Sequence, residues 1–130
     1  MRKSLTIASM IFAMAALAGP VRADGTQMTG EELLALLGSG KTIGLGGPEV
    51  SYAGELELMG DGTGKGVAQT HDGKKSFTLT GTWKIVDDEF CRTWAEFNDG
   101  LEVCERWVRT GPNKVEVFVG EKKLGVNHWQ

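Results

Sequence analysis

The sequence has few of the side chains that form metal centres. Its 130 residues include only two cysteines and two histidines, and no Cys-x-x-Cys spacing occurs. A structural zinc ion takes about four such ligands, so His71 and His128 do not by themselves predict a metal site. We therefore expect neither a metal ion nor a cofactor.

A surplus of basic residues is also missing. The chain carries 17 acidic residues against 14 lysines and arginines, and three of these basic residues, Arg2, Lys3 and Arg22, fall in the N-terminal segment considered next. Proteins that bind nucleic acid need a basic surface, because they neutralise backbone phosphates. The acidic balance predicts that nucleic acid is not a partner.

No apolar run is long enough to span a bilayer, which takes about 20 residues. The run from Leu5 to Leu17 lies between a basic start and Ala23, a small residue that suits signal peptidase. This order is typical of a bacterial secretory signal. We expect residues 1–23 to be cleaved, which leaves residues 24–130 as a single small β domain. The domain is expected to be periplasmic or secreted, without a membrane span.

The two cysteines predict a disulfide. An exported chain folds in an oxidising space, where two cysteines most simply form one bond. A turn signal from Asn98 to Gly100 lies between them, so Cys91 and Cys104 are expected to face each other on a β-hairpin. This register also places Trp94 opposite Leu101. A bond that closes a loop of this length stabilises by roughly 3 kcal/mol in the chain-entropy model.

Alternation of apolar and polar residues predicts strands in most of the remaining chain. The clearest run ends just before Asp87, and its apolar face consists of Phe77, Leu79, Gly81, Trp83 and Ile85. Similar runs extend from Tyr52 to Leu58 and from Val115 to Val119. A last short strand is expected from Leu124 to Trp129.

One short helix is expected near the start of the mature chain. Thr29, followed three residues later by Glu32, forms a capping box, and four leucines then give the segment an apolar face before Gly38 ends it. A short amphipathic helix is stable only when it packs on other structure. This helix is therefore expected to cover one end of the sheet.

These patterns together predict a mainly β fold. Roughly six or seven strands, separated by turn residues, favour an antiparallel meander closed or nearly closed into a small lipocalin-like barrel. Closure removes the exposed strand edges that promote aggregation. An open sheet backed by the helix is the alternative that the pattern leaves open.

The segment after the predicted helix contains a deceptive motif. Gly38–Thr42 is similar to the end of a nucleotide-binding P-loop, but the motif needs a glycine where Ala35 stands and should follow a strand. We interpret this segment as a helix stop and a flexible connector. The glycine-rich stretch from Ile43 to Pro48 fits a tight corner or a strand that passes close to other backbone.

Catalytic patterns are weak. His71 and Asp72 are neighbours, but adjacent strand positions point to opposite faces, and turn histidines are usually solvated. The carboxylates of Asp87 and Glu89 suit glycoside hydrolysis only in a larger cleft than a domain of this size offers. The sequence therefore favours a protein that is not an enzyme.

Several motifs occur together in a known family. The matching residues are Tyr52 and Gly54, Asp61 and Gly62, Gly81 and Trp83, Cys91 and Trp94, and Cys104. With the predicted signal peptide, they make the chain resemble a family of small secreted proteobacterial proteins classed as a domain of unknown function. The resemblance covers most of the mature chain and implies no particular activity. The Gly81-Thr82-Trp83 triplet is also similar to the GxW motif of lipocalins, where it opens the first strand.

The central hairpin carries the candidate binding site. With the cysteines facing each other, one face of the hairpin holds Glu105 together with the candidates Arg92, Trp94, Trp107 and Arg109. Aromatic rings with arginines between them suit a small anionic or amphiphilic ligand. The alternative is that the tryptophans pack at the edge of the core while the charged groups reach water.

The sequence thus favours a small, exported, non-catalytic binding protein for an anionic or amphiphilic small molecule. A protein-binding module, such as an inhibitor or an accessory subunit of an envelope protein, is the alternative, and a small hydrolase is a third. The carrier and the protein-binding module differ in the direction in which the hairpin face with the four candidate residues points. A face turned into a cavity favours a carrier, whereas a flat exposed patch favours a protein partner.

Overall fold

The computed structural model of the chain describes residues 25–130, and the predicted signal segment, residues 1–23, lies outside this range. In chain order, the secondary-structure elements of this range are α1 (Gly30–Leu37), β1 (Lys41–Gly46), β2 (Tyr52–Leu58), β3 (Thr63–Thr70), β4 (Ser76–Val86), β5 (Glu89–Trp94), the 3-10 turn η1 (Asn98–Gly100), β6 (Val103–Gly111), β7 (Lys114–Val119) and β8 (Lys122–His128). None of the helices in this part of the chain has the length and apolar character needed to cross a membrane.

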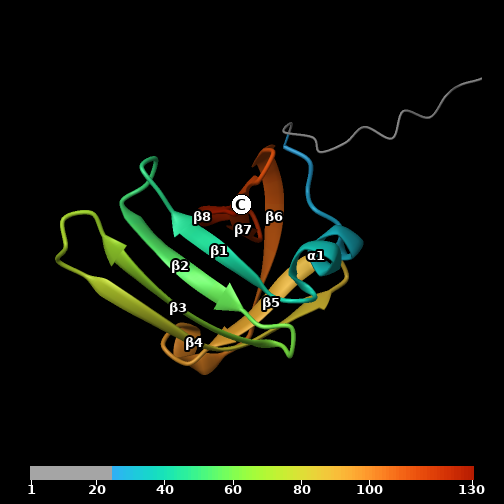
Figure 1. Cartoon of the computed structure of the whole chain (residues 1–130), viewed down its shortest axis with the longest axis horizontal. Coiled ribbons are helices and arrows are strands. Elements are labelled where there is room, and N and C mark those ends of the chain that lie inside the picture. Colours follow the sequence, from blue (N-terminus) through green and yellow to red (C-terminus); the bar gives the residue numbers. More distant parts are fainter. Residues whose placement is uncertain (1–24) are drawn as a thin grey trace, which may run out of the picture.

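The strands form one closed antiparallel barrel, in which each strand pairs with the next along the chain (Figure 1). The barrel closes between β1 and β8, where Gly44 pairs with His128 and Leu45 with Asn127. This ladder leaves neither terminal strand with a free edge. The predicted mainly β barrel with one short helix is confirmed, and the open-sheet alternative is excluded.

The barrel has eight strands instead of the predicted six or seven, because the glycine-rich stretch after the helix is itself a strand. Lys41 and Thr42, predicted to lie in a flexible connector, begin β1. Gly44 at its centre lies against the His128 ring, from which a Cβ would be only 2.1 Å away. Such glycines pack closely and leave no apolar alternation to recognise. The last strand also starts earlier than predicted, at Lys122.

Helix α1 covers one end of the barrel, as its amphipathic pattern predicts (Figure 1). Leu33 and Leu37 are fully buried in the core. The helix start docks on the turn between β4 and β5, where the backbone N–H of Gly30 donates to Asp88 Oδ1 at 2.7 Å. A Cβ on Gly30 would lie 1.9 Å from the backbone oxygen of Asp87, so this approach requires glycine.

The capping box predicted for α1 is present. Thr29 Oγ1 accepts from the backbone N–H of Glu32, and Glu32 Oε1 accepts from the backbone N–H of Thr29, each at 3.1 Å. Replacing Thr29 by alanine is expected to lower the free energy of unfolding by about 1 kcal/mol, because the first helical turn loses this partner. Urea unfolding of the alanine variant measures the effect, and Thr29→Ser, which keeps the hydroxyl, is the control. Equal stability of the alanine variant and the unmodified protein would contradict this account.

The predicted disulfide joins β5 and β6. Cys91 lies opposite Cys104 in the strand pairing, and their sulfur atoms are bonded. The pairing ends one residue closer to the turn than the cysteines. Beyond this ladder the chain forms a loop around η1. The sequence predicted that Trp94 faces Leu101, and this prediction is wrong because the two residues are not paired. The predicted hairpin is therefore confirmed near the disulfide, but the loop at its tip is longer than expected.

A layer of aromatic rings fills the barrel next to α1. Trp83 stacks on Phe90 with ring centroids 5.9 Å apart, and Phe90 lies 5.0 Å from Trp107. Trp107 in turn lies 6.4 Å from the ring of Trp129. Phe90 and Trp107 are almost completely buried. This layer separates the helix-covered end of the barrel from the other end.

Candidate ligand-binding site inside the barrel

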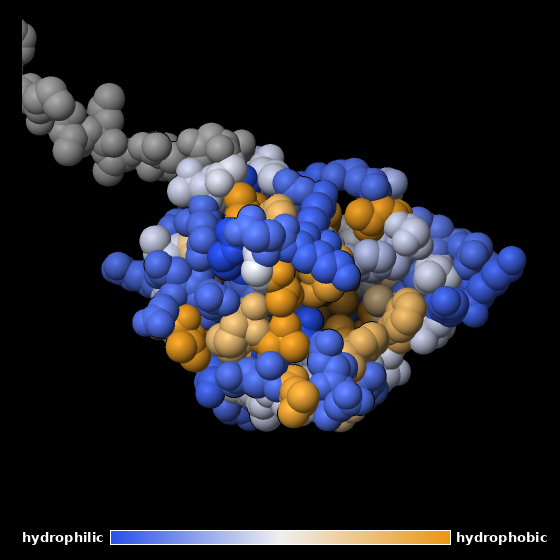
Figure 2. Space-filling model, turned by 180° about the vertical axis from the view of Figure 1, so that it is seen from behind, coloured by the Kyte–Doolittle hydropathy of each residue, from blue (hydrophilic) through white to orange (hydrophobic). Residues whose placement is uncertain are grey.

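A cavity of about 380 Å³ lies in the barrel beyond the aromatic layer and opens to solvent. Phe90 contributes to its inner end, whereas Phe77, Phe97 and Leu124 line it near the loops opposite α1. Most of the lining side chains are hydrophobic. In Figure 2, which views the molecule from behind, hydrophobic residues gather around a hollow in the surface. The barrel thus combines one covered end with one accessible end.

β3 presents small residues to the inside of the barrel, and one of them, Ala68, lines this cavity. Burial alternates along the strand, and its inward positions include Gly64, Gly66 and Ala68. A Cβ on Gly64 would lie 3.0 Å from the Trp94 indole, so this glycine makes space for the ring. An eight-stranded barrel is wide enough either to be filled by side chains or to hold one small ligand. The cavity beside Ala68 favours the second arrangement here.

Two charged residues, Arg92 and Glu105, are buried in the cavity wall. Their side chains are 7% and 8% exposed, and Arg92 Nε donates to Glu105 Oε2 at 2.9 Å. Trp107 Nε1 donates to the other carboxylate oxygen, Oε1, at 3.1 Å. Arg92 Nη1 is buried without a hydrogen-bond partner among residues 25–130. Since a guanidinium carries five N–H donors, the ion pair leaves donors free for a ligand.

The disulfide holds this ion pair in register. Cys91 precedes Arg92 on β5, and Cys104 precedes Glu105 on β6. Neighbouring strand residues point to opposite faces, so the sulfur bridge lies on the outer side of the hairpin and the charged pair on the inner side. The covalent bond thereby fixes the relative positions of the two charges.

Burial raises the pKa of Glu105 above its usual range, while the Arg92 charge and the hydrogen bonds from Trp107 and Arg92 act in the opposite direction. Both carboxylate oxygens already accept an N–H. Neither neighbouring N–H group can accept a hydrogen bond from a protonated carboxyl. The geometry therefore suits an ionised Glu105 at neutral pH, which gives the pair no net charge.

Asn127 of β8 adds another polar group to the cavity lining. The residue is 7% exposed, and its side chain makes no hydrogen bond within the described part of the chain. An amide offers both donors and an acceptor to a molecule in the cavity. Asn127 can therefore bind a polar atom of a ligand together with Arg92.

The structure separates the four residues that the sequence placed on one binding face. Arg92 and Trp94 line the cavity. Trp107 is fully buried in the aromatic layer and reaches the site only through its bond to Glu105. Arg109 lies near the helix, where its Nη2 donates to Glu32 Oε2 at 3.1 Å. The alternative in which the charged groups of this face reach water is wrong for Arg92 and Glu105.

Asn127 was not recognised from the sequence. It occupies a buried position of β8, and a polar residue inside an otherwise apolar strand end is the available signal. The pairing of β7 with β8 shifts between Val117 and Phe118, however, so the alternation along β8 is irregular. A pattern of strict alternation cannot locate inward residues in such a strand.

His71 and Asp72 do not form an acid–base pair. His71 Nε2 lies 3.0 Å and 2.9 Å from the backbone oxygens of Gly47 and Val50. The Asp72 carboxylate accepts instead from the Thr70 hydroxyl at 2.7 Å. Both side chains are exposed and hold surface turns together, which agrees with the solvated role favoured by the sequence.

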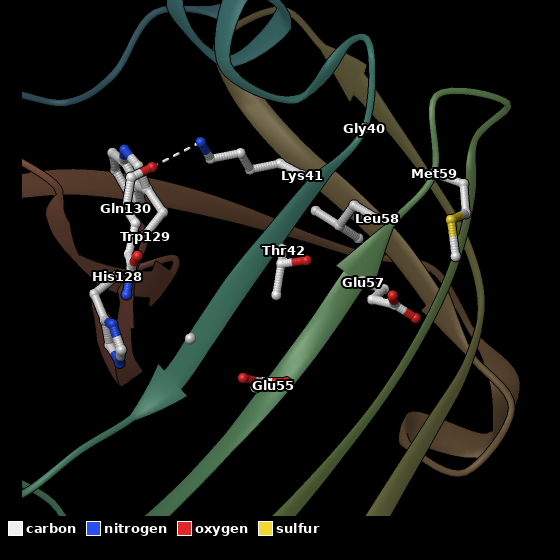
Figure 3. Close-up of a pocket in the computed structure, with 11 residues that line it drawn as sticks. Gly40, Lys41, Thr42, Glu55, Glu57, Leu58, Met59, His128, Trp129 and Gln130 are labelled. Atoms are coloured by element: carbon white, nitrogen blue, oxygen red, sulfur yellow. Dashed lines mark hydrogen bonds between the residues drawn. The ribbon is translucent and has the colours of Figure 1, made fainter.

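A second, wider depression of about 660 Å³ lies beside β1, β2 and the C-terminal residues (Figure 3). Glu55 and Glu57 of β2 line it, and across it Lys41 Nζ donates to the backbone oxygen of Gln130 at 2.8 Å. Both glutamates are exposed. With solvated acidic groups and no buried charge among its lining residues, this depression is a weaker candidate than the interior cavity.

No family model matches the chain, and neither a curated protein nor a solved structure matches it significantly. The resemblance to small secreted proteobacterial proteins therefore stays a prediction from the sequence motifs. The function of the cavity is inferred below from its shape, lining and charges.

Proposed function

We propose that the protein is a non-catalytic carrier that holds a small amphiphilic molecule in the barrel cavity. The observation behind this proposal is a hydrophobic cavity with a buried arginine in its wall, whose Nη1 has no partner among the described residues. Hydrophobic lining with a few well-placed polar groups is typical of small-molecule sites. The apolar part of the ligand would contact the rings and aliphatic side chains, and its polar part would meet Arg92.

The dimensions of the cavity favour a small ligand. Binding pockets for small molecules measure about 300–1,000 Å³, and this one, at about 380 Å³, lies near the lower end. The covered end at α1 prevents a long chain from passing through. A protein partner could contact only the rim, which makes a protein-binding module the second candidate.

The proposed place of work is the bacterial periplasm or the outside of the cell. The Cys91–Cys104 disulfide supports an oxidising compartment, since such bonds persist there and are rare in the cytosol. The predicted signal segment supports export. Periplasmic recovery of the protein with residues 1–23 removed would test this location, and a full-length, reduced cytosolic protein would contradict it.

Filling the cavity is expected to weaken ligand binding strongly. In the experiment, N-phenyl-1-naphthylamine, a dye that fluoresces in apolar surroundings, is titrated into the protein. Ala68→Leu places a larger side chain in the lumen and should weaken dye binding by about tenfold or more. Val67→Leu is the matched control, because Val67 is the neighbouring residue on the outer face and is 62% exposed. Circular dichroism verifies that both variants fold.

The outcomes of this titration separate the candidate functions. Saturable dye binding that Ala68→Leu removes and Val67→Leu retains supports the carrier. Dye binding that is equal in both variants places the dye outside the lumen and contradicts the proposal. Absence of dye binding, combined with recovery of one envelope protein in a pull-down, favours the protein-binding module.

A further inference from the structure

We propose that the ligand is uncharged and that its polar end carries a carbonyl-type acceptor, such as an amide or ester. This inference rests on the proposed carrier function and names the chemical class of its ligand. It follows from the balance of charge and of hydrogen-bonding groups in the cavity wall.

The cavity has no net charge to offer to an anion. Arg92 and Glu105 are the only charged residues among those that line it, and they neutralise each other through a contact of 2.9 Å. Trp107 donates to the remaining carboxylate oxygen, which further supports the ionised form of Glu105. The arginine therefore already has its counter-ion, and a ligand need not supply one.

A carboxylate entering this cavity would leave an uncompensated negative charge beside Glu105. Taking an anion out of water into an apolar enclosure is costly unless an unpaired positive charge receives it. An uncharged acceptor avoids that cost, because it adds no charge to the neutral pair. The structure therefore selects against simple anions while leaving an attractive site for a polar, neutral group.

The free hydrogen-bonding groups match such a ligand. Arg92 has N–H donors that the ion pair does not use, and a carbonyl oxygen can accept from them. Asn127 contributes an amide whose side chain makes no hydrogen bond within the described residues. An amide or ester group thus satisfies the buried donors that a hydrocarbon would leave unpaired.

Two probes of equal chain length test this inference by displacing N-phenyl-1-naphthylamine at neutral pH. Octanamide is uncharged and octanoate is an anion, while their hydrocarbon chains are matched. The unmodified protein is expected to bind octanamide about tenfold more tightly than octanoate. Stronger binding of octanoate, or failure of both probes to displace a bound dye, would overturn the inference and leave the carrier proposal intact. Failure of the dye itself to bind would remove the carrier proposal.

Changing the charge of the pair should reverse this preference. Glu105→Gln keeps the shape of the side chain but leaves Arg92 without a counter-ion, so octanoate should gain about tenfold relative to octanamide. Glu116→Gln removes an equal charge from the outer side of the barrel, where Glu116 pairs with Lys123, and should leave the preference unchanged. An unchanged preference in Glu105→Gln would overturn the inference.

A second variant keeps the test decisive if Glu105→Gln does not fold. The double variant Arg92→Met with Glu105→Gln removes both charges at once and avoids leaving either one buried alone. It is expected to bind octanamide about tenfold more weakly than the unmodified protein, because the guanidinium donors are gone, without any gain for octanoate. Undiminished octanamide binding in this double variant would show that Arg92 does not receive the carbonyl.

Discussion

Replacing Arg92 by methionine is expected to lower the free energy of unfolding by about 3–5 kcal/mol at neutral pH, because it leaves the Glu105 carboxylate buried without its counter-ion. The two side chains are only 7% and 8% exposed, so water cannot take the place of the guanidinium. Urea unfolding followed by tryptophan emission measures the loss. A change below about 1 kcal/mol would be typical of an exposed ion pair and would contradict the buried arrangement.

The double variant Arg92→Met with Glu105→Gln should recover most of that loss. Replacing both members of a buried ion pair by uncharged residues of similar volume is often neutral or stabilising, since neither charge then has to be desolvated. Stability close to that of the unmodified protein is the expected result. If the double variant is as unstable as Arg92→Met alone, the loss comes from packing of the arginine stem and not from the charge of Glu105.

The pH dependence of these variants provides an independent check. Because the pKa of Glu105 is raised in the folded state, the folded protein binds more protons there than the unfolded chain, and the contribution of Glu105 to stability falls as pH rises through this raised pKa. Removing the opposing Arg92 charge should raise the pKa further, although the Trp107 indole and Asn127 still share this part of the barrel. The Arg92→Met variant should therefore lose more stability at about pH 8 than at about pH 5.

Removing the disulfide is the second change with a large expected effect. The double variant Cys91→Ala with Cys104→Ala should lower the free energy of unfolding by roughly 3 kcal/mol in the chain-entropy model, because the unfolded chain regains the freedom of the loop between the two cysteines. The strand pairing between β5 and β6 covers only three residue pairs, so the backbone ladder that holds the hairpin is short. Urea unfolding with and without reductant measures this contribution.

Reductant provides the control for this experiment. It should destabilise the unmodified protein by about the same amount as the double variant and have no effect on the double variant itself. A mass increase of two hydrogen atoms on reduction, with no alkylatable thiols beforehand, would confirm the bond in the purified protein. Full stability after reduction would show that the loop is held by packing alone. Loss of dye binding together with stability would indicate that the disulfide also positions Arg92 and Glu105.

The strands and the helix were predictable where local patterns are regular. Phe77 to Ile85 alternates with polar residues, and the structure confirms this face as the inner one of β4. Thr29 and Glu32 identify the start of α1 because a capping box depends on residues only three positions apart. β1 was missed as a regular strand because Gly44 and Gly46 carry no side chains that could show which face is apolar.

The sequence by itself determined the alternating strands, the capped helix and the Cys91–Cys104 hairpin, because each depends on residues that are close along the chain. Only the tertiary structure decided that β1 pairs with β8 and that a cavity remains open beside Ala68. It also decided that Arg109 packs near the helix and does not line that cavity. These outcomes depend on which residues of distant strands face one another across the barrel. No local spacing encodes that relation, since it arises only when the last strand closes on the first.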